Sequence, residues 1–265
     1  PGEGEIVYIG SDYTISWNAP GFLNVDIALF KGQDLLLTIE QVFPNGGFYR
    51  WNIPEGITEG RDYSIRISRA GDPGQSIRSD MMVIRQQGET SFFTDKRDGQ
   101  IYKTVKIGSQ WWMAENFNYQ CEGSYCYNDS DSNCLIYGKL YTLEAALKQA
   151  PEGWHLPSDQ EWKQLEAFLG IGQEELDLLG GRGRFSGRLL SSGGGCGFNA
   201  LPAGYFSWCK NASNHLQYEA DFWSSTYLED GRPILRILIT RSGKVIRHWP
   251  GCQSACSVRY IKNDG

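Results

Sequence analysis

Three absences limit what this chain of 265 residues can be. No apolar run approaches the roughly 20 residues that a helix needs to span a bilayer. Cysteine is absent before Cys121, so no disulfide bond holds the first part of the chain together. An excess of positive charge is also absent, because the formal net charge is −6. This balance argues against nucleic acid as a partner.

Sequence motifs of common enzymes are absent as well. Two glycine-rich segments, 180–184 and 191–195, lack the Gly-Lys-Ser/Thr that completes a phosphate-binding loop. Neither Gly-x-Ser-x-Gly nor His-Glu-x-x-His occurs, and the histidines His155, His215 and His248 are scattered. We therefore expect no catalytic residues, and we expect His155 to make a structural hydrogen bond.

The cysteines lie mostly in polar loops rich in Gly, Ser and Asn. A metal site would place them in pairs at Cys-x-x-Cys spacing with histidine, and this pattern is missing. We expect disulfide bonds in an oxidising compartment. The chain begins at Pro1 with a Gly- and Glu-rich lead, so we also expect that an export signal has been removed. The cysteines are Cys121, Cys126, Cys134, Cys196, Cys209, Cys252 and Cys256.

Composition indicates a globular protein of one or two domains. Hydrophobic residues make up 40% and charged residues 21% of the chain. The aromatic content of 13% suits β-rich cores or carbohydrate-facing surfaces. Basic residues between Arg232 and Arg247 are expected on solvated strand faces.

Residues 5–86 alternate between apolar and polar side chains in short runs separated by turns. This pattern predicts an all-β immunoglobulin-like sandwich over residues 1–86. Tyr63 follows a Glu-Gly-Arg-Asp turn, which predicts a tyrosine corner that ties the strand to the preceding loop. Without a cysteine pair, the core must depend on Trp17, Trp51 and the aliphatic side chains.

The pattern changes after this sandwich. Residues 87–99 are polar apart from Phe92 and Phe93 and predict a linker pinned by those rings. Tyr141–Gln149 is rich in Ala and Leu and predicts a first helix. Ser158 and Glu161 have capping-box spacing and begin a second helix that ends at Gly170. The glycine-rich segment 180–197 is expected to be irregular, and short strands are expected after it.

Two resemblances extend this interpretation. Residues 4–86, with the phrases YTISWNAPG, VDIALFKG, GGFYRWNIP and GRDYSIRI, resemble immunoglobulin- or fibronectin-III-like domains of the Ser-Thr-rich, cell-wall-associated type. This resemblance implies a spacer or interaction module without catalysis.

Residues 95–265 resemble the Fibrobacter succinogenes major paralogous domain, a bacterial secreted or surface family. The phrases that carry the resemblance are DGQIYKTVKIGSQWWMAENFNY, CYNDSDSNC, YGKLYTLEAAL, PEGWHLPSDQEWKQLE, GFNALPAGYF, FWSST and SVRYIK. The helix LPSDQEW and the strand SVRYIK are also similar to the formylglycine-generating-enzyme branch of the C-type-lectin-like fold. The resemblance implies an α+β C-type-lectin-like domain over residues 100–265. In that fold two helices pack around a twisted, mostly antiparallel sheet whose termini meet.

The resemblance also bears on the disulfide bonds. Many family members carry cysteines where this chain has Ala150 and Tyr260, and the joint loss implies that those cysteines would pair. The bond Cys126–Cys134 matches the family's CYN…NC loop. Local pairing would also join Cys196 to Cys209 and Cys252 to Cys256, leaving Cys121 over. Six cysteines allow fifteen connectivities, so these last two pairs stay open.

Asp129, Asp131 and Asn133 place oxygen ligands at alternate positions, as calcium loops do. No glycine at the turn and no closing glutamate accompany them, so the alternative is the polar tip of a disulfide-closed loop. Calcium is the one cofactor that the sequence suggests.

The sugar-binding signature of C-type lectins is absent, which argues against sugar binding bridged by calcium. Trp111, Trp208 and Trp249 are the candidates for stacking on a sugar. Trp111 is the most exposed candidate, since relatives often have a small polar residue there. Trp112, Trp154, Trp162 and Trp223 are expected in the core.

We therefore expect an exported bacterial cell-surface protein, a lipoprotein whose only membrane attachment was a removed lipid anchor. Its expected function is non-enzymatic recognition or adhesion, with a cell-surface glycan or protein as partner. One alternative is a structural component of a surface assembly without a soluble ligand. A weaker alternative is an oxidoreductase of the formylglycine-generating type that uses Cys252 and Cys256. Activity is expected in the loops Cys121–Cys134 and Gly180–Asn214.

Overall fold

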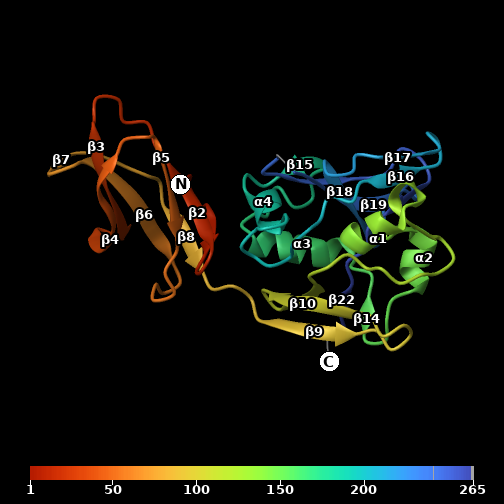
Figure 1. The fold of residues 1–265 in the computed structure, drawn as a ribbon. Helices are drawn as coiled ribbons and strands as arrows, with labels where there is room; N and C mark the ends of the chain where they lie inside the picture. The colour runs from red at the N-terminus through yellow and green to blue at the C-terminus, as the bar shows by residue number, and fades with distance from the viewer. Residues whose placement is uncertain (241, 264–265) are drawn as a thin grey trace. The chain divides into compact units, whose positions relative to one another are not determined.

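The computed structural model describes residues 1–240 and 242–263. Contacts divide the chain into two compact units, Pro1–Gln87 and Gly88–Gly265, which run from red to orange and from yellow to blue in Figure 1. The predicted linker 87–99 is wrong for Thr90–Thr94, because this segment forms strand β9 of the second unit. Phe93 packs on Trp154, as expected of a pinned segment, whereas Phe92 is exposed.

The first unit is a sandwich of two sheets. The larger sheet has the order β1-β8-β6-β3-β4, with β7 also paired to β6, and the smaller sheet joins β2 to β5. The strands are β1 (Ile6–Tyr8), β2 (Asp12–Ser16), β3 (Asn24–Lys31), β4 (Asp34–Pro44), β5 (Phe48–Asn52), β6 (Gly60–Arg69), β7 (Asp72–Arg78) and β8 (Met82–Arg85).

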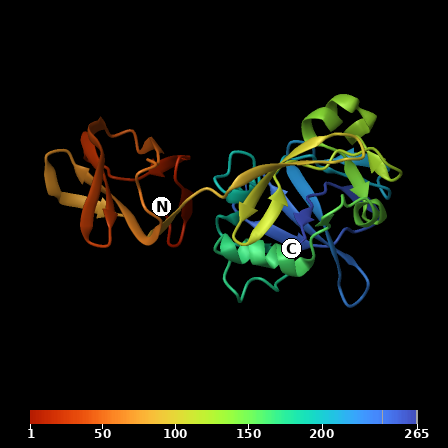
Figure 2. The same ribbon diagram turned by 90° about the horizontal axis from the view of Figure 1, so that it is seen from below.

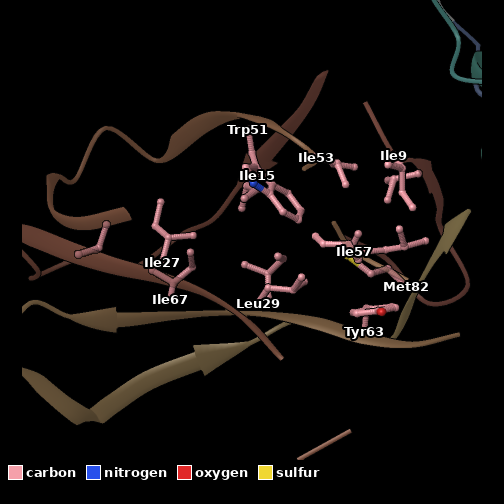
Figure 3. Packing of buried hydrophobic residues seen from close by; sticks show 14 residues of the cluster. Ile9, Ile15, Ile27, Leu29, Trp51, Ile53, Ile57, Tyr63, Ile67 and Met82 are labelled. Carbon is pink, nitrogen blue, oxygen red and sulfur yellow. The ribbon is translucent and has the colours of Figure 1, made fainter. Parts of the chain in front are cut away.

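Alternate residues of the two sheets meet in a single core. Ile15 of β2 and Trp51 of β5 face Ile27, Leu29 and Ile67 of the larger sheet (Figure 3), and all of them are buried. Period-2 alternation requires this arrangement, since successive side chains of a strand point to opposite faces. The alternation therefore predicted the inward positions of these five residues correctly.

Two polar contacts close the edges of this core. The Tyr63 hydroxyl donates a hydrogen bond to the Thr58 carbonyl over 2.7 Å, which confirms the tyrosine corner. Trp17, expected in the core, is only partly buried, and its Nε1 donates to Asn45 Oδ1 over 2.8 Å. Trp17 therefore ties a loop to the sandwich, while Trp51 fills the interior.

The described residues of the second unit form three sheets and several short helices. Its strands are β9 (Thr90–Thr94), β10 (Ile101–Ile107), β11 (Gln110–Met113), β12 (Ser124–Tyr125), β13 (Leu140–Thr142), β14 (Trp154–His155), β15 (Gly180–Arg182), β16 (Tyr205–Ser207), β17 (Ala212–Asn214), β18 (Glu219–Tyr227), β19 (Pro233–Ile239), β20 (Val245–His248), β21 (Ser254–Cys256) and β22 (Ile261–Lys262). Its helices are η1 (Tyr127–Asp129), α1 (Asp131–Tyr137), α2 (Leu143–Lys148), α3 (Asp159–Phe168) and α4 (Ser186–Leu190).

The sheet β14-β22-β11-β10-β9 contains the first and last strands of the unit, and Figure 2 shows its yellow strands from below. A second sheet has the order β12-β13-β21-β16-β17, and a third the order β15-β20-β19-β18. Helix α3 lies between the first and third sheets in Figure 1. Its Trp162 contacts Trp112 of β11 and Phe222 of β18, at ring-centroid distances of 4.8 and 6.0 Å.

Helix α3 begins as the sequence predicts. Ser158 caps it, and the capping box with Glu161 is complete. His155 Nε2 lies 2.7 Å from Glu161 Oε1, so this histidine has the expected structural hydrogen bond. The helix therefore starts at a fixed point beside β14.

Other expected elements differ in extent. Helix α2 begins at Leu143, because Leu140–Thr142 form a strand and Thr142 caps the helix. The segment 180–197, expected to be irregular, contains β15 and α4. Its glycines permit close backbone approach: a Cβ on Gly187 would lie 2.3 Å from the carbonyl oxygen of Lys244. Here glycine marks tight packing.

Candidate functional site

The structure brings two of the three candidate tryptophans to one region. Trp208 donates its backbone N–H to the Gln253 carbonyl, and Trp249 lies at the start of the same loop. The bond Cys209–Cys252 joins these two segments, with a Cα–Cα distance of 6.3 Å. Trp111 is half-buried on β11, in another sheet. A single sugar platform of all three is therefore not formed.

This disulfide bond corrects two predictions. Cys209 pairs with Cys252, so the expected local pairs Cys196–Cys209 and Cys252–Cys256 are wrong. Cys196 and Cys256 are buried free thiols, and Cys121 is a third free thiol. Hairpin β16–β17 and the β20–β21 loop bring Cys209 and Cys252 together, so the pairing follows the folded loops and not the distance along the sequence. The oxidoreductase alternative loses its cysteine pair, because Cys252 is already bonded.

The predicted bond Cys126–Cys134 is present. It closes the loop of the calcium candidates, but this loop is largely helical. Asp129 ends η1, Asp131 begins α1, and Asn133 lies within α1, where its Nδ2 donates to the Tyr127 carbonyl. Alternate positions of a helix face different directions, which argues against one shared calcium ion. Within residues 1–240 and 242–263, no cluster of three or more His, Cys, Asp or Glu side chains has metal-binding geometry.

A pocket of about 410 Å³ lies beside the Cys209–Cys252 bond. Strand β21 contributes alternate residues to its wall, namely Ser254 and Cys256, and Cys252 continues the same alternation. Leu235 and Ile237 of β19 supply apolar surface. We call this the β18–β21 pocket. Its full lining is Tyr205, Ser207, Cys209, Lys210, Glu219, Asp221, Leu235, Ile237, His248, Trp249, Pro250, Gly251, Cys252, Ser254 and Cys256.

Asp221 gives this pocket its chemistry. The residue is only 4% exposed, and its Oδ1 has no hydrogen-bond partner among the described residues. Burial, and then the nearby Glu219 charge, raises the pKa of the Asp221 carboxyl well above its usual value. A buried polar atom without a partner costs free energy. The pocket therefore contains an acid that a ligand can satisfy.

Two further groups surround Asp221. Glu219 lies two residues before it on the same face of β18. Its Oε1 is 2.6 Å from Nδ1 of His215. Cys256 is fully buried. Burial, followed by the charges of Asp221 and Glu219, raises the pKa of its thiol. The thiol is therefore protonated at neutral pH and a poor nucleophile.

The lining of the pocket also includes aromatic and basic side chains. The Trp249 ring stacks on His248 with centroids 4.5 Å apart, and Arg232 lies 3.7 Å from its centroid. These contacts hold Trp249 in place and occupy ring surface that a sugar would use. Lys210 also lines the pocket. A neighbouring pocket of about 280 Å³ shares Pro250, Cys252 and Ser254 with it.

The sequence missed the central residues of this pocket. Asp221 precedes the core residue Trp223 by two positions, so both side chains lie on the same face of the strand. An acidic residue at a core-facing strand position was therefore the signal that could have identified this site. The expected active region Gly180–Asn214 supplies Tyr205, Ser207, Cys209 and Lys210. The other expected region, Cys121–Cys134, supplies no residue to the pocket as the structure describes it.

Comparison with known families divides the chain as the structure does. A Kre9/KNH-like N-terminal Ig-like domain matches residues 1–79. The Fibrobacter succinogenes major domain matches residues 105–262, more than half of the chain. No curated protein matches the chain. Together the two domain types point to a secreted or surface protein with a cell-wall-type module. The chain thus belongs to the Fibrobacter succinogenes major domain family, which it combines with an Ig-like domain.

Proposed function

We propose that this protein is a non-enzymatic recognition protein of the bacterial cell surface that binds a glycan in the β18–β21 pocket. The observation that carries the proposal is Asp221, a buried carboxyl without a partner that lines a pocket of about 410 Å³. In this proposal the sandwich acts as a spacer, and the second unit has a C-type-lectin-like fold. The sheet shared by β9 and β22 supports that fold assignment.

The lining of the pocket favours a glycan. Ligand sites combine apolar walls with a few polar groups that fix orientation. Leu235 and Ile237 offer apolar surface to the C–H face of a sugar, and Asp221 accepts a hydrogen bond from a hydroxyl. Tyr205 and Ser254 add hydroxyl groups to the wall. Because the neighbouring pocket shares Pro250, Cys252 and Ser254 with this one, a glycan longer than one sugar ring could extend into it.

Export and surface attachment are part of the same proposal. Within residues 1–240 and 242–263, none of the helices combines the length and the apolar character needed to cross a membrane. Attachment through a lipid anchor is proposed from the sequence interpretation. Mass spectrometry of the protein isolated from its native membrane would test it by detecting a lipid-modified N-terminal cysteine.

A structural role without a soluble ligand has one observation in its favour. Strand β4 is at the edge of the larger sheet, and Leu35 and Leu36 on it are 55% and 48% exposed. Exposed apolar side chains on an edge strand are suited to pairing with another chain.

A glycan array probed with the full chain tests the main proposal. We expect binding that Asp221→Asn weakens and Trp111→Ala leaves unchanged, since Trp111 lies in another sheet. Running the array with calcium and with EDTA decides whether Asp129, Asp131 and Asn133 contribute. Loss of binding in Trp111→Ala but not in Asp221→Asn would move the site to β11. Silence on the array under both conditions would contradict glycan binding.

A further inference from the structure

The charged groups of the β18–β21 pocket indicate which class of sugar it binds. We propose that it recognises the free ammonium group of an amino sugar, with Asp221 as the anion that receives it and Glu219 as a second, supporting carboxylate. This inference rests on the proposed glycan-binding function and names the class of sugar.

Asp221 has no positively charged partner among the described residues. The carboxyl is buried, and Asp221 forms no ion pair within the described residues, whereas buried carboxylates are normally paired. The charged group nearest in sequence on the same face is Glu219, which has the same sign. A ligand hydroxyl would satisfy one lone pair of Asp221. A ligand ammonium would satisfy it and also supply the missing opposite charge.

Groups on other elements also line the pocket that contains Asp221. Cys256 on β21 is fully buried, and burial raises the pKa of its thiol, so this side chain brings no positive charge to Asp221. Tyr205 on β16 and the stacked pair His248 and Trp249 on β20 and its loop also line the pocket. Lys210 is the one amine of the protein among the lining residues, and no ion pair joins it to Asp221 in the described part of the chain.

Binding of an ammonium group changes the protonation of Asp221. Burial keeps Asp221 protonated in the free protein as pH rises past the ordinary carboxyl range. When an ammonium group enters, the Asp221 proton leaves for the solvent, and the carboxylate that remains pairs with the charged amine. No covalent bond forms or breaks other than the O–H bond of the acid. Binding should therefore release about one proton per site over the window in which free Asp221 is protonated.

A matched pair of sugars separates charge from shape. Calorimetry with the full chain would compare a glucosamine trimer with the corresponding N-acetylglucosamine trimer, which has no charge. We expect the amine trimer to bind at least roughly tenfold more tightly. Repeating the titration in buffers with different ionisation enthalpies measures the released proton. Asp221→Asn should remove both the preference and the proton release. Glu174→Gln, at an exposed carboxylate outside the lining of the pocket, should retain both.

Each outcome is decisive. Equal, Asp221-dependent binding of both trimers overturns the ammonium inference and leaves glycan recognition standing. Failure of both trimers, with Asp221-dependent binding of another glycan on the array, does the same. Failure of both trimers and of the whole array overturns both statements. Binding of a lysine peptide in place of the amine trimer overturns the sugar class.

Discussion

Arg259 donates a hydrogen bond from Nε to Asn116 Oδ1 over 2.8 Å, although 143 residues separate the two. The guanidinium is fully buried and has no carboxylate partner in the described chain; it also donates to the carbonyls of Met113, Phe198 and Asn199. Burial lowers the pKa of Arg259 to about 9. Four acceptors thus hold one cation at the point where the last strands meet the first sheet.

Substitution of Arg259 by lysine should therefore destabilise the second unit. A single ammonium cannot reproduce the planar set of donors, so buried carbonyls lose their partners. The expected loss in the free energy of unfolding is about 3–5 kcal/mol. Urea unfolding followed by tryptophan fluorescence measures it. Arg232→Lys, at an exposed pair with Asp230, is the control and should change stability far less. Equal effects of the two substitutions would refute the structural role of Arg259.

Asp221→Asn should stabilise the protein at neutral pH while it weakens ligand binding. The folded state raises the pKa of this acid, so the folded state holds the proton to higher pH than the unfolded chain does. Stability therefore falls as pH rises above the unfolded value near 3.8, by about 1.4 kcal/mol per pH unit until the folded pKa is reached. Asparagine lacks this titration. The stability difference between variant and wild type should be absent below the unfolded value and positive near pH 7, as urea midpoints across this range would show.

Sequence predicted best those features whose partners are close along the chain. Ser158 and Glu161 form a capping box within one helical turn. Tyr63 reaches back only to Thr58. In both cases local spacing determines the geometry, so the pattern alone identifies the contact. The bond Cys126–Cys134 is equally local.

The pocket could not be predicted in the same way. Its walls come from β16, β18, β19, β20 and β21, and no periodicity states which strands lie opposite one another. Cys209 and Cys252 are 43 residues apart, and only the folded loops bring them together. Asp221 has the alternation of a core strand, so its strand was predicted while the missing partner of its carboxyl was not. That information belongs to tertiary packing.

The Cys209–Cys252 bond should contribute more stability than the Cys126–Cys134 bond. Closing the longer loop of 43 residues is worth about 4 kcal/mol in the chain-entropy estimate, against about 2.5 kcal/mol for the loop of 8 residues. Paired serine substitutions at each bond, followed by urea unfolding, would show this order. Peptide mapping of the denatured, unreduced protein should find three alkylated cysteines, Cys121, Cys196 and Cys256. A Cys196–Cys209 peptide would contradict the connectivity.

Acid should weaken the protein through Asp159. Burial alone would raise the pKa of this carboxyl, but Arg247, Arg236 and Lys163 outweigh burial and hold it well below its usual range. Because the folded pKa is lowered, the stabilisation is complete above the unfolded value near 3.8 and is lost as pH falls towards the folded value. Asp159→Asn should unfold at lower urea near pH 6 and approach wild type below pH 3. Asp177→Asn removes an exposed partner of Lys163 and should show little of this dependence.

An engineered bond between Ala150 and Tyr260 tests whether these positions replace a family disulfide. Both contribute to one core cluster, and the Tyr260 hydroxyl donates to the Ala146 carbonyl over 2.8 Å. Replacing Tyr260 by cysteine should cost about 3–5 kcal/mol, because it empties a fully buried volume. A bridge that closes about 110 residues should return roughly 5 kcal/mol. In a Cys121→Ser background, which removes a competing thiol of the same cluster, the oxidised double variant should therefore match wild type within about 2 kcal/mol. The single variant Tyr260→Cys should remain destabilised. If mass spectrometry finds both engineered thiols free after oxidation, the two positions are too far apart, and the packing of Tyr260 does not stand in for a lost bridge.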